Sequence, residues 1–334
     1  MNTATTTVLD TAEERFAQRT RFLRSTRIKD FLFTQLIRMN AIVAIGIILL
    51  IFLYVGKEAY PLLVNAEVHK EVTLQKLFLP QHYGAEDMPF PFVWQPVSEE
   101  PKYSVLPLFL GSLKVTLVAL MFAAPLAIGA ALYTAEFAKP RIREILKPVI
   151  ELLAGIPSVV LGFLALVVLA TWLQDTFAFN YRLNAINAGI AMGLAILPII
   201  YTVSEDALSS VPRSYREASL ALGVSSWKTA WAVVLPAATP GIFASLVLGF
   251  GRAIGETMIV LMASGNAAVT SLEFSDSVRT VSASIAAELG EVVFGSPHYH
   301  VLFFLGTLLF GLTFILNMLG EFLVERLKRR LMGT

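Results

Sequence analysis

The sequence predicts an all-α, polytopic membrane protein with six transmembrane helices. Of the 334 residues, 56% are hydrophobic and 15% are charged, and the mean hydropathy is +0.68. Soluble globular domains carry about 25% charged residues, so this apolar excess excludes a water-soluble fold and a disordered chain. With a formal net charge of +1 the chain has no overall positive field to attract nucleic acid, and the absence of cysteine excludes disulfide bonds and thiolate chemistry.

Each predicted span approaches the roughly 20 apolar residues that a helix needs to cross the hydrocarbon core. Backbone polar groups must be satisfied internally in lipid, and the alternating pattern of barrel strands is absent, so we interpret these stretches as helices. The predicted spans are residues 39–56, 106–135, 152–173, 183–204, 239–264 and 301–320. The charged residues within them are Lys114, Arg252 and Glu256.

The distribution of Lys and Arg predicts that both termini are cytoplasmic, because basic loops stay on the inner side. The resulting segments are a basic tail (1–38), a first transmembrane helix (39–56), an extracytoplasmic loop (57–105), a five-helix core (106–325) and a basic C-terminal tail (326–334). Inner basic residues are Arg15, Arg19, Arg21, Arg24, Arg27, Lys29, Arg38, Lys139, Arg141, Arg143, Lys147, Arg213, Arg216, Lys228, Arg326, Lys328, Arg329 and Arg330. Outer ones are Lys57, Lys70, Lys76, Lys102, Arg182 and Arg279. The N-terminal tail is either an amphipathic helix on the anionic leaflet or a loosely ordered topology signal.

Motifs of the common catalytic classes are missing, which favours transport or scaffolding over an enzyme. The sequence contains no G-x-x-x-x-G-K-[ST], no H-E-x-x-H and no G-x-S-x-G segment. Because the ATP-binding motif is missing, uphill transport would draw its energy from a partner or an ion gradient.

The four histidines fall in predicted outer segments, and no metal site is predicted. A short helix is predicted over 281–294, and its Glu288 and Glu291 are expected to be solvated.

The segment between the fourth and fifth spans predicts a short helix that lies crosswise under the membrane. Pro212 suits a first helical turn, and Gly223 supplies a left-handed stop. Ser225 or Ser226 then caps a second helix. Pro236 is expected to interrupt the chain before the fifth span.

This segment resembles the EAA signature of ABC importer permeases, and we call residues 209–236 the EAA loop. Glu217-Ala218-Ser219, three residues, Gly223, nine residues and then Val233-Val234-Leu235-Pro236 follow the family pattern. The departures are Ser for the second Ala and Val for Ile. The resemblance implies a coupling helix that fits a groove on a separate ATPase subunit. Glu217, Ala218, Ser219 and Gly223 are the implied coupling residues, and the small side chains would permit close contact with that subunit.

The charged residues of the fifth predicted span form a second candidate site. An Arg at the centre of a span costs about 2.5–3.5 kcal/mol on insertion scales, so Arg252 should face protein or a water-filled path. Glu256 lies four residues later, which on a helix places the two on one face as an ion pair. The pair either locks two subunits together or contacts a passing anion, whose oxygens match a guanidinium. Close helix packing is predicted at Gly251, Gly255, Gly189 and Gly193.

Residues 251–258, Gly-Arg-Ala-Ile-Gly-Glu-Thr-Met, resemble the phosphate-specific transport (Pst) permeases, in particular the C-type subunit. Residues 151–158, Glu-Leu-Leu-Ala-Gly-Ile-Pro-Ser, and the segment 295–300 extend the resemblance, which covers roughly residues 105–325. It implies a type-1 importer permease fold in the bacterial inner membrane. It also implies that Arg252 and Glu256 line the substrate pathway, with Thr257 and Ser158 as lesser candidates.

The implied partners are a second six-helix permease, two copies of a cytoplasmic ATPase, an extracytoplasmic phosphate-binding protein and membrane lipid, with no nucleic acid. The resemblance further implies that the ATPase subunit hydrolyses ATP with Mg, and that this chain binds no cofactor and is not an enzyme. The expected function is therefore the permease subunit of an ATP-driven inorganic phosphate importer. Alternatives are a permease for tungstate, molybdate or sulfate, because Arg252 alone does not separate tetrahedral oxyanions, and a phosphate-sensing regulatory membrane scaffold. A free-standing channel or ion-driven carrier is disfavoured, because a docking helix has meaning only with an ATPase.

Overall fold

A computed structural model of the chain describes residues 3–80 and 91–332, with side-chain exposure for 30–80 and 91–329. The chain forms two compact units, Met1–Lys57 and Glu58–Thr334. Six helices in the described part are long and apolar enough to cross a membrane, which confirms the predicted spans in number. They are Asp30–Val64, Leu106–Glu136, Ser158–Phe177, Ala185–Ser209, Ser226–Gly255 and Pro297–Arg329.

The first unit consists of one helix, α1 (Thr3–Ala59), which continues a few residues into the second unit. The predicted boundary between a tail and a span at residue 38 falls inside this helix. Residues 3–38 are helical and continue into the span, whereas a position of the tail on the membrane surface stays a prediction. The apolar side chains from Phe31 to Tyr54 are exposed all around the helix, which is the pattern of a lipid-facing span.

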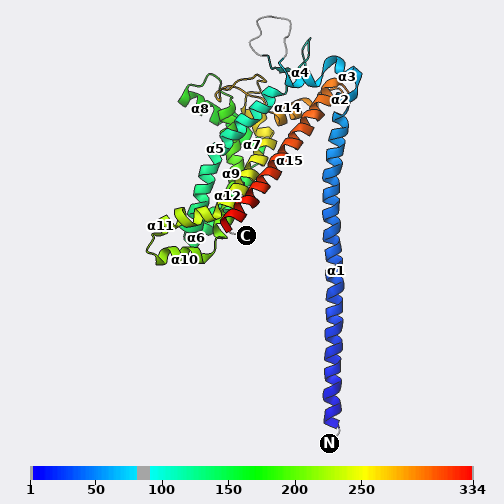
Figure 1. Cartoon of the computed structure of the whole chain (residues 1–334), viewed down its shortest axis with the longest axis vertical. Coiled ribbons are helices and arrows are strands. Elements are labelled where there is room, and N and C mark those ends of the chain that lie inside the picture. The colour runs from blue at the N-terminus through cyan, green and yellow to red at the C-terminus, as the bar shows by residue number, and fades with distance from the viewer. Residues whose placement is uncertain (1–2, 81–90, 333–334) are drawn as a thin grey trace. The chain divides into compact units, whose positions relative to one another are not determined.

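The core of the second unit is formed by α5 (Leu106–Glu136), α9 (Ala185–Ser209) and α12 (Leu235–Gly255), which pack side by side (Figure 1). Fully buried alanines recur every four residues along α5 at 119, 123, 127 and 131, so that face is flat enough for a close neighbour. A Cβ at Gly189 would lie 2.5 Å from Val118, and one at Gly193 would lie 2.7 Å from Phe122. Close packing is thus present at both glycines of α9.

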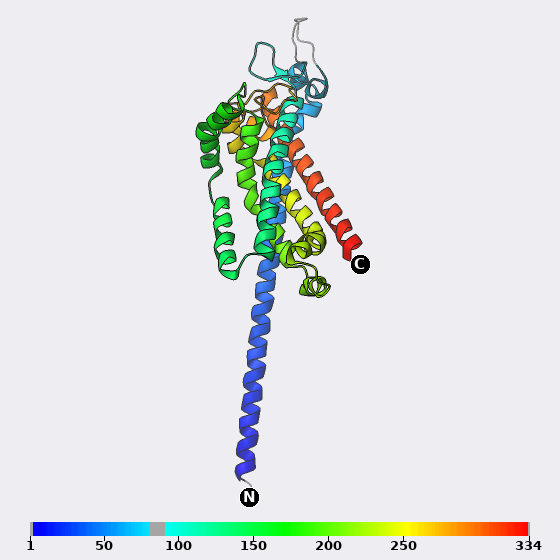
Figure 2. The same cartoon turned by 90° about the vertical axis from the view of Figure 1, so that its left-hand side faces the viewer.

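The third span starts later than the sequence predicts. Helix α6 (Pro140–Ala154) ends before Gly155, and a new helix, α7 (Ser158–Leu164), begins after Pro157. The π-helix η1 (Ala165–Leu169) and α8 (Ala170–Phe177) complete the span. The predicted start at residue 152 is wrong because Pro157 lacks an N–H and disfavours helical backbone at Ile156. Figure 2 shows α6 as a separate helix below the span that follows it.

The fifth span also differs from its prediction. Helix α11 (Ser226–Thr229), the π-helix η2 (Ala230–Val234) and α12 run on continuously, so the predicted interruption at Pro236 is wrong. Pro236 lies in the first turn after the π-helix, where the helical hydrogen-bond pattern has already changed. The helix instead ends at Gly255, and α13 (Met258–Ala263) begins after a two-residue break.

The segment predicted as the outer loop folds into α2 (Pro61–Val64), α3 (Ala66–Glu71), α4 (Leu74–Phe78) and an antiparallel pair, β1 (Trp94–Gln95) and β2 (Lys102–Tyr103). These elements pack on α14 (Val281–Glu288) and α15 (Pro297–Met332) around buried residues that include Trp94 and Leu302. The helix predicted over 281–294 therefore stops at Glu288. Helix α10 (Arg213–Ala221), α11 and α6 lie at the opposite end of this unit (Figures 1 and 2).

Glu288 is not the solvated side chain that we expected. It is 13% exposed, and its carboxylate accepts hydrogen bonds from Trp94 Nε1 at 3.0 Å and interacts with Arg279 Nη2 at 2.5 Å and with His298 Nε2 at 2.8 Å. This network ties the β1 strand to the segment that precedes α14 and to the start of α15. His82, one of the four histidines predicted to lie in outer segments, is outside the described residues.

Candidate functional site

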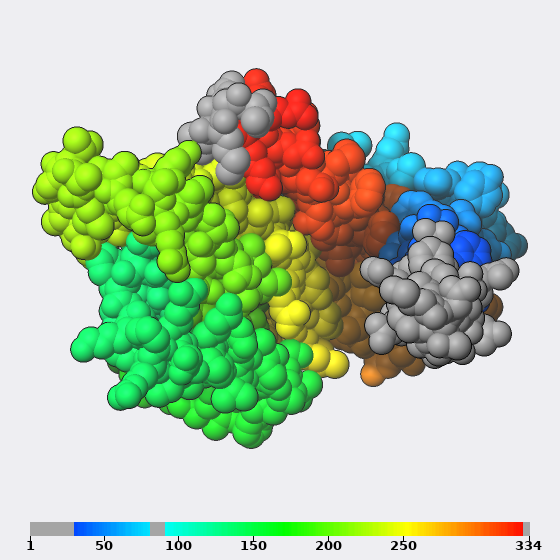
Figure 3. Space-filling model, turned by 90° about the horizontal axis from the view of Figure 1, so that it is seen from below, coloured from blue at the N-terminus to red at the C-terminus, as the bar shows by residue number. Residues whose placement is uncertain are grey.

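The EAA loop forms the short helix that its sequence predicts. Helix α10 starts after Pro212 and its last turn is followed by Gly223, whose φ of 77° is the left-handed conformation that favours glycine. Ser225 then caps α11 by accepting a hydrogen bond from the Lys228 N–H at 3.4 Å. The loop lies at the surface in Figure 3, where it is coloured yellow-green.

The outward face of this loop is apolar in α10 and at the start of the fifth span. Tyr215 is 52% exposed, Trp227 is 61% exposed and Leu222 is 85% exposed. Glu217 and Ala218 are exposed beside them, and among the described residues Glu217 makes no hydrogen bond or ion pair. An apolar surface around an unused carboxylate is suited to another protein.

Ser219 does not face outward with its neighbours in the motif. It is buried, and its hydroxyl lies 2.9 Å from that of Thr229 in α11. The hydrogen bond turns this side chain toward the chain itself, so the predicted contact with a partner would not involve the Ser219 hydroxyl. Serine in place of the second alanine therefore joins α10 to α11 and leaves no hydroxyl unsatisfied.

An ion pair that no local spacing predicts holds α10 to the core. Arg216 Nη2 lies 2.6 Å from Glu136 Oε1 at the end of α5, and Arg216 Nε lies 3.1 Å from both carboxylate oxygens. Arg216 also donates to the carbonyl oxygens of Val211 at 2.6 Å and Leu208 at 2.9 Å. Both charged side chains are largely buried. The guanidinium of Arg216 thus connects α10 both to α5 and to the turn between α9 and α10.

A second cluster joins α6 to α9 at the same end of the unit. The buried carboxylate of Glu205 accepts hydrogen bonds from Arg143 and, at 2.9 Å, from both Lys147 Nζ and Ser209 Oγ. The hydrogen bond to Glu205 raises the pKa of Lys147 above its usual value. These contacts hold α6 against α9, although the chain leaves the helical conformation between α6 and α7.

Arg252, in the last turn of α12, faces a hollow of about 360 Å³ that we call the Arg252 hollow. Its side chain is exposed there, and among the described residues it makes no hydrogen bond or ion pair. The lining residues are Glu151, Ala154, Ala195, Pro198, Ile199, Thr202, Val203 and Arg252. A guanidinium with five unused donors in a hollow is suited to an oxyanion.

The predicted ion pair of Arg252 with Glu256 is absent from the described chain. Glu256 follows the end of α12 with extended backbone (φ −69°, ψ 133°), so the spacing of four residues no longer places the two side chains on one face. Its carboxylate accepts from the Thr257 N–H at 3.2 Å, and its carbonyl accepts from Ser282 Oγ at 2.7 Å. Glu256 lines a narrow crevice with Ser112 and neighbouring residues instead of the Arg252 hollow.

The lesser candidates and the remaining glycines lie near this break. Thr257 Oγ1 donates to the carbonyl of Gly255 at 3.3 Å, and Ser158 is the first residue of α7. A Cβ at Gly251 would lie 3.0 Å from Asn317 Oδ1, so α12 approaches α15 closely there. A Cβ at Gly255 would meet no atom of the described chain within 4 Å, so the predicted packing role is not met within this chain.

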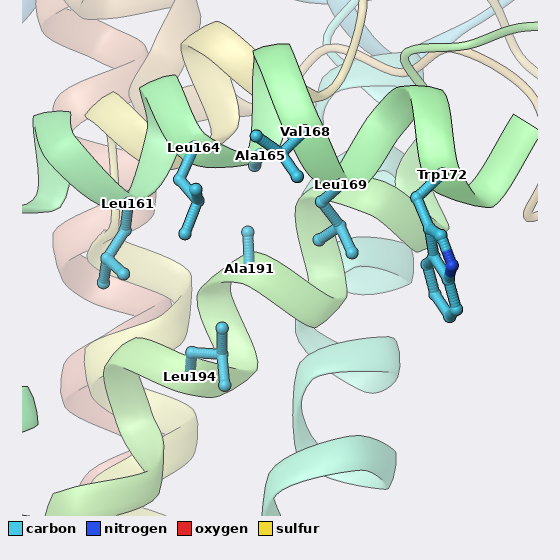
Figure 4. A pocket seen from close by; sticks show the side chains of 8 residues that line it. All are labelled: Leu161, Leu164, Ala165, Val168, Leu169, Trp172, Ala191 and Leu194. Atoms are coloured by element: carbon cyan, nitrogen blue, oxygen red, sulfur yellow. The ribbon is translucent and has the colours of Figure 1, made fainter.

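A further hollow, of about 200 Å³, lies between the third span and α9 and is lined by apolar side chains (Figure 4). Leu161, Leu164 and Val168 contribute from the third span, and Ala191 and Leu194 from α9. Because this lining offers no cation and almost no hydrogen-bond donor, it is unsuited to an anion.

Residues 123–333 match the family described as "Binding-protein-dependent transport system inner membrane component". The chain is 37% identical over 235 residues to "Probable ABC transporter permease protein YqgH" of Bacillus subtilis (strain 168), covering 70% of this chain and 76% of that protein. It is 32% identical over 256 residues to "Phosphate transport system permease protein PstC" of Mesorhizobium japonicum, covering 71% of this chain and 77% of that protein. It is 33% identical over 249 residues to PstC 1 of Mycobacterium tuberculosis, covering 68% and 74%.

Two solved structures share the fold. A bacterial alginate ABC transporter in complex with an alginate pentasaccharide-bound periplasmic protein aligns with a TM-score of 0.54 and 16% identity, covering 89% of this chain and 95% of that one. The MetNI methionine ABC transporter in an inward-facing conformation aligns with a TM-score of 0.50 and 16% identity, covering 67% and 94%. At such identity the likeness shows the fold alone, which is that of the type-1 ABC importer permeases.

Proposed function

Because the chain belongs to the family of binding-protein-dependent transport system inner membrane components, and is thus a multi-pass ABC importer permease subunit, we propose that its cargo is inorganic phosphate. The similarity to relatives named as phosphate transport permeases supports this cargo. The proposal places the protein in the bacterial cytoplasmic membrane with both termini inside, as the basic loops favour.

The observation that carries the proposal is the position of Arg252. A guanidinium is costly to keep in a membrane span unless water, protein or a ligand solvates it. Arg252 makes no ion pair within the described chain and faces a hollow, so a ligand that accepts several hydrogen bonds is its natural partner. The planar donors of Arg match the geometry of phosphate oxygens.

Coupling to ATP would take place through the EAA loop. In the proposed assembly this chain pairs with a second six-helix permease, and two copies of a cytoplasmic ATPase bind from inside. The exposed apolar side chains around Glu217 would form the contact of this chain with the ATPase. ATP and Mg would be hydrolysed on that partner, and this chain would carry no catalytic residue and no cofactor.

Transport then follows from the alternating exposure of one path. A phosphate-loaded binding protein docks on the outer face, and ATP draws the two ATPase subunits together. The movement of α10 reaches α5 through Arg216 and Glu136. The spans open outward, phosphate enters and passes Arg252, and hydrolysis returns the spans to the inward-open state.

Reconstitution tests the proposal. The chain is incorporated into liposomes with its second permease, ATPase and binding protein, and uptake of radiolabelled phosphate is measured with and without ATP. Hydrogen bonds to charged groups contribute about 1.5–3 kcal/mol, so Arg252→Ala should reduce ATP-dependent uptake by about tenfold or more. Arg141→Ala, at an exposed position of α6, is the matched control and should leave uptake unchanged.

Equal uptake by Arg252→Ala and the parent would refute the role of Arg252. ATP-driven uptake of sulfate, molybdate or tungstate in place of phosphate would identify the other oxyanion importers as the correct alternative. An assembled complex that transports none of these anions would favour the regulatory scaffold.

A further inference from the structure

We propose that Glu151 is a specificity-determining residue of the transport path, and that together with Arg252 it forms a site for an oxyanion that still carries a proton. This inference rests on the proposed function, because it concerns the same path. It replaces Glu256, the carboxylate that the sequence places beside Arg252, with a carboxylate from another helix.

Three helices bring polar side chains to the Arg252 hollow. Glu151 comes from the last turn of α6, Thr202 from α9 and Arg252 from the last turn of α12. Among the described residues none of these three side chains makes a hydrogen bond or ion pair, with each other or with a neighbour. A cation, a carboxylate and a hydroxyl thus line one space with their hydrogen-bonding capacity unused. The carboxylate, the hydroxyl and the guanidinium are therefore all available to a small molecule in this hollow.

The hollow has the size and lining for a small anion. Its volume of about 360 Å³ lies within the roughly 300–1,000 Å³ of small-molecule sites. A water molecule occupies about 30 Å³ in the liquid, so a tetrahedral oxyanion fits with part of its hydration shell. The other lining residues are apolar: Ala154, Ala195, Pro198, Ile199 and Val203. They lower the local dielectric and strengthen each charge interaction in the hollow.

A carboxylate in an anion site selects for a proton on the anion. At neutral pH, inorganic phosphate retains at least one P–OH group, which donates a hydrogen bond to the Glu151 carboxylate while Arg252 binds the deprotonated oxygens. Sulfate, molybdate and tungstate are fully deprotonated and offer only acceptors. They would therefore meet Glu151 as a like charge without a compensating hydrogen bond, and sites built around one hydrogen bond reject analogues that lack it.

The selectivity of a binding protein would hide this effect during uptake, so the test measures binding to the permease itself. The complex of this chain with its second permease and ATPase is purified in detergent at neutral pH, without binding protein and without ATP. Equilibrium dialysis then gives the binding of radiolabelled phosphate and of radiolabelled sulfate at matched ionic strength. The parent should bind phosphate in preference to sulfate.

Four variants separate the contributions. Glu151→Gln should raise sulfate binding and lower the phosphate-to-sulfate ratio by about tenfold or more, since it removes the like charge and keeps the shape. Glu151→Asp should retain the preference of the parent for phosphate. Glu144→Gln, an exposed position on the same helix, is the matched control and should behave as the parent. Arg252→Ala should lose binding of both anions.

Uptake by the same variants keeps the two proposals apart. If parent liposomes show no ATP-driven phosphate uptake, the proposed function fails. If they take up phosphate while Glu151→Gln keeps the phosphate-to-sulfate binding ratio of the parent, the role of Glu151 is overturned and the proposed function stands. Absence of measurable phosphate binding by a parent complex that transports phosphate would also overturn the site. Because Glu151 is exposed, its variants should assemble normally, and gel filtration with the ATPase checks this.

Discussion

Arg216 in α10 and Glu136 at the end of α5 form an ion pair with Nη2 2.6 Å from Oε1, although 80 residues separate them in the sequence. Both side chains are largely buried, and Arg216 also holds the carbonyl groups of the α9–α10 turn. We therefore expect a displacement of α10 to reach α5, a helix long and apolar enough to cross a membrane.

Removing this link should uncouple ATP hydrolysis from transport. In Arg216→Ala we expect the complex to hydrolyse ATP while the phosphate imported per ATP falls by about tenfold. A decrease of this size matches the free energy that hydrogen bonds to charged groups contribute. The measurement is uptake and hydrolysis in the same liposomes. Arg213→Ala, an exposed arginine on the same helix, is the control. An unchanged ratio of phosphate to ATP in Arg216→Ala would rule out transmission through this pair.

The left-handed turn at Gly223 should be required for binding of the ATPase. Its φ of 77° costs a residue with a Cβ about 1–2 kcal/mol, and more when the residue is β-branched, so Gly223→Val should distort the end of α10. The expected result is weaker co-purification of the ATPase. Gly290→Val, at an open position at the other end of this unit, is the comparison. Normal co-purification of Gly223→Val would exclude this turn from the contact.

The approach of α9 to α5 should not tolerate a larger residue at Gly193. A Cβ there would lie 2.7 Å from Phe122 and 3.1 Å from the Ala119 carbonyl, so Gly193→Val should destabilise the protein by about 1–3 kcal/mol. Thermal unfolding of the detergent-purified protein measures this as a lower Tm. Gly129→Val, where a Cβ meets nothing within 4 Å in the described chain, should change the Tm far less. Equal Tm values for the two variants would contradict the close packing.

Because the Tyr103 phenol is buried, we expect the folded state to lose stability at alkaline pH. Burial, and then the charges of Glu71 and Glu288, raise the pKa of its phenol above the ordinary value of 10.0. The folded state therefore keeps a proton that the unfolded state releases, so the stabilisation is complete below about pH 10 and is lost as the pH rises beyond it. Tm measured from about pH 8 to about pH 11 should fall less steeply in Tyr103→Phe than in the parent.

The control for this prediction is Tyr181→Phe, because Tyr181 is exposed. Its profile should follow that of the parent. If Tyr103→Phe and the parent lose stability equally above about pH 10, another group accounts for the alkaline transition.

Local residue chemistry was sufficient to predict several features of the candidate site. Runs of apolar residues predict spans because the bilayer sets their length, and α10 ends where Pro212 and Gly223 predict, because the backbone preferences of these residues are local. The end of a helix before Pro157 and the break after Gly255 were not predicted, because the third and fifth spans were expected to run through these positions. Hydropathy alone predicts one helix through an apolar run, because it does not register where the backbone leaves the helical conformation.

The sequence by itself thus determined the all-α membrane fold, its six spans, the EAA loop and the presence of Arg252 in the fifth span. Only the tertiary structure decided which charges meet. It places Glu151 on the hollow that Arg252 faces and turns Glu256 away, and it pairs Arg216 with Glu136. The physical reason is that helical periodicity relates residues three or four apart on one continuous helix, whereas these side chains come together through the packing of separate helices.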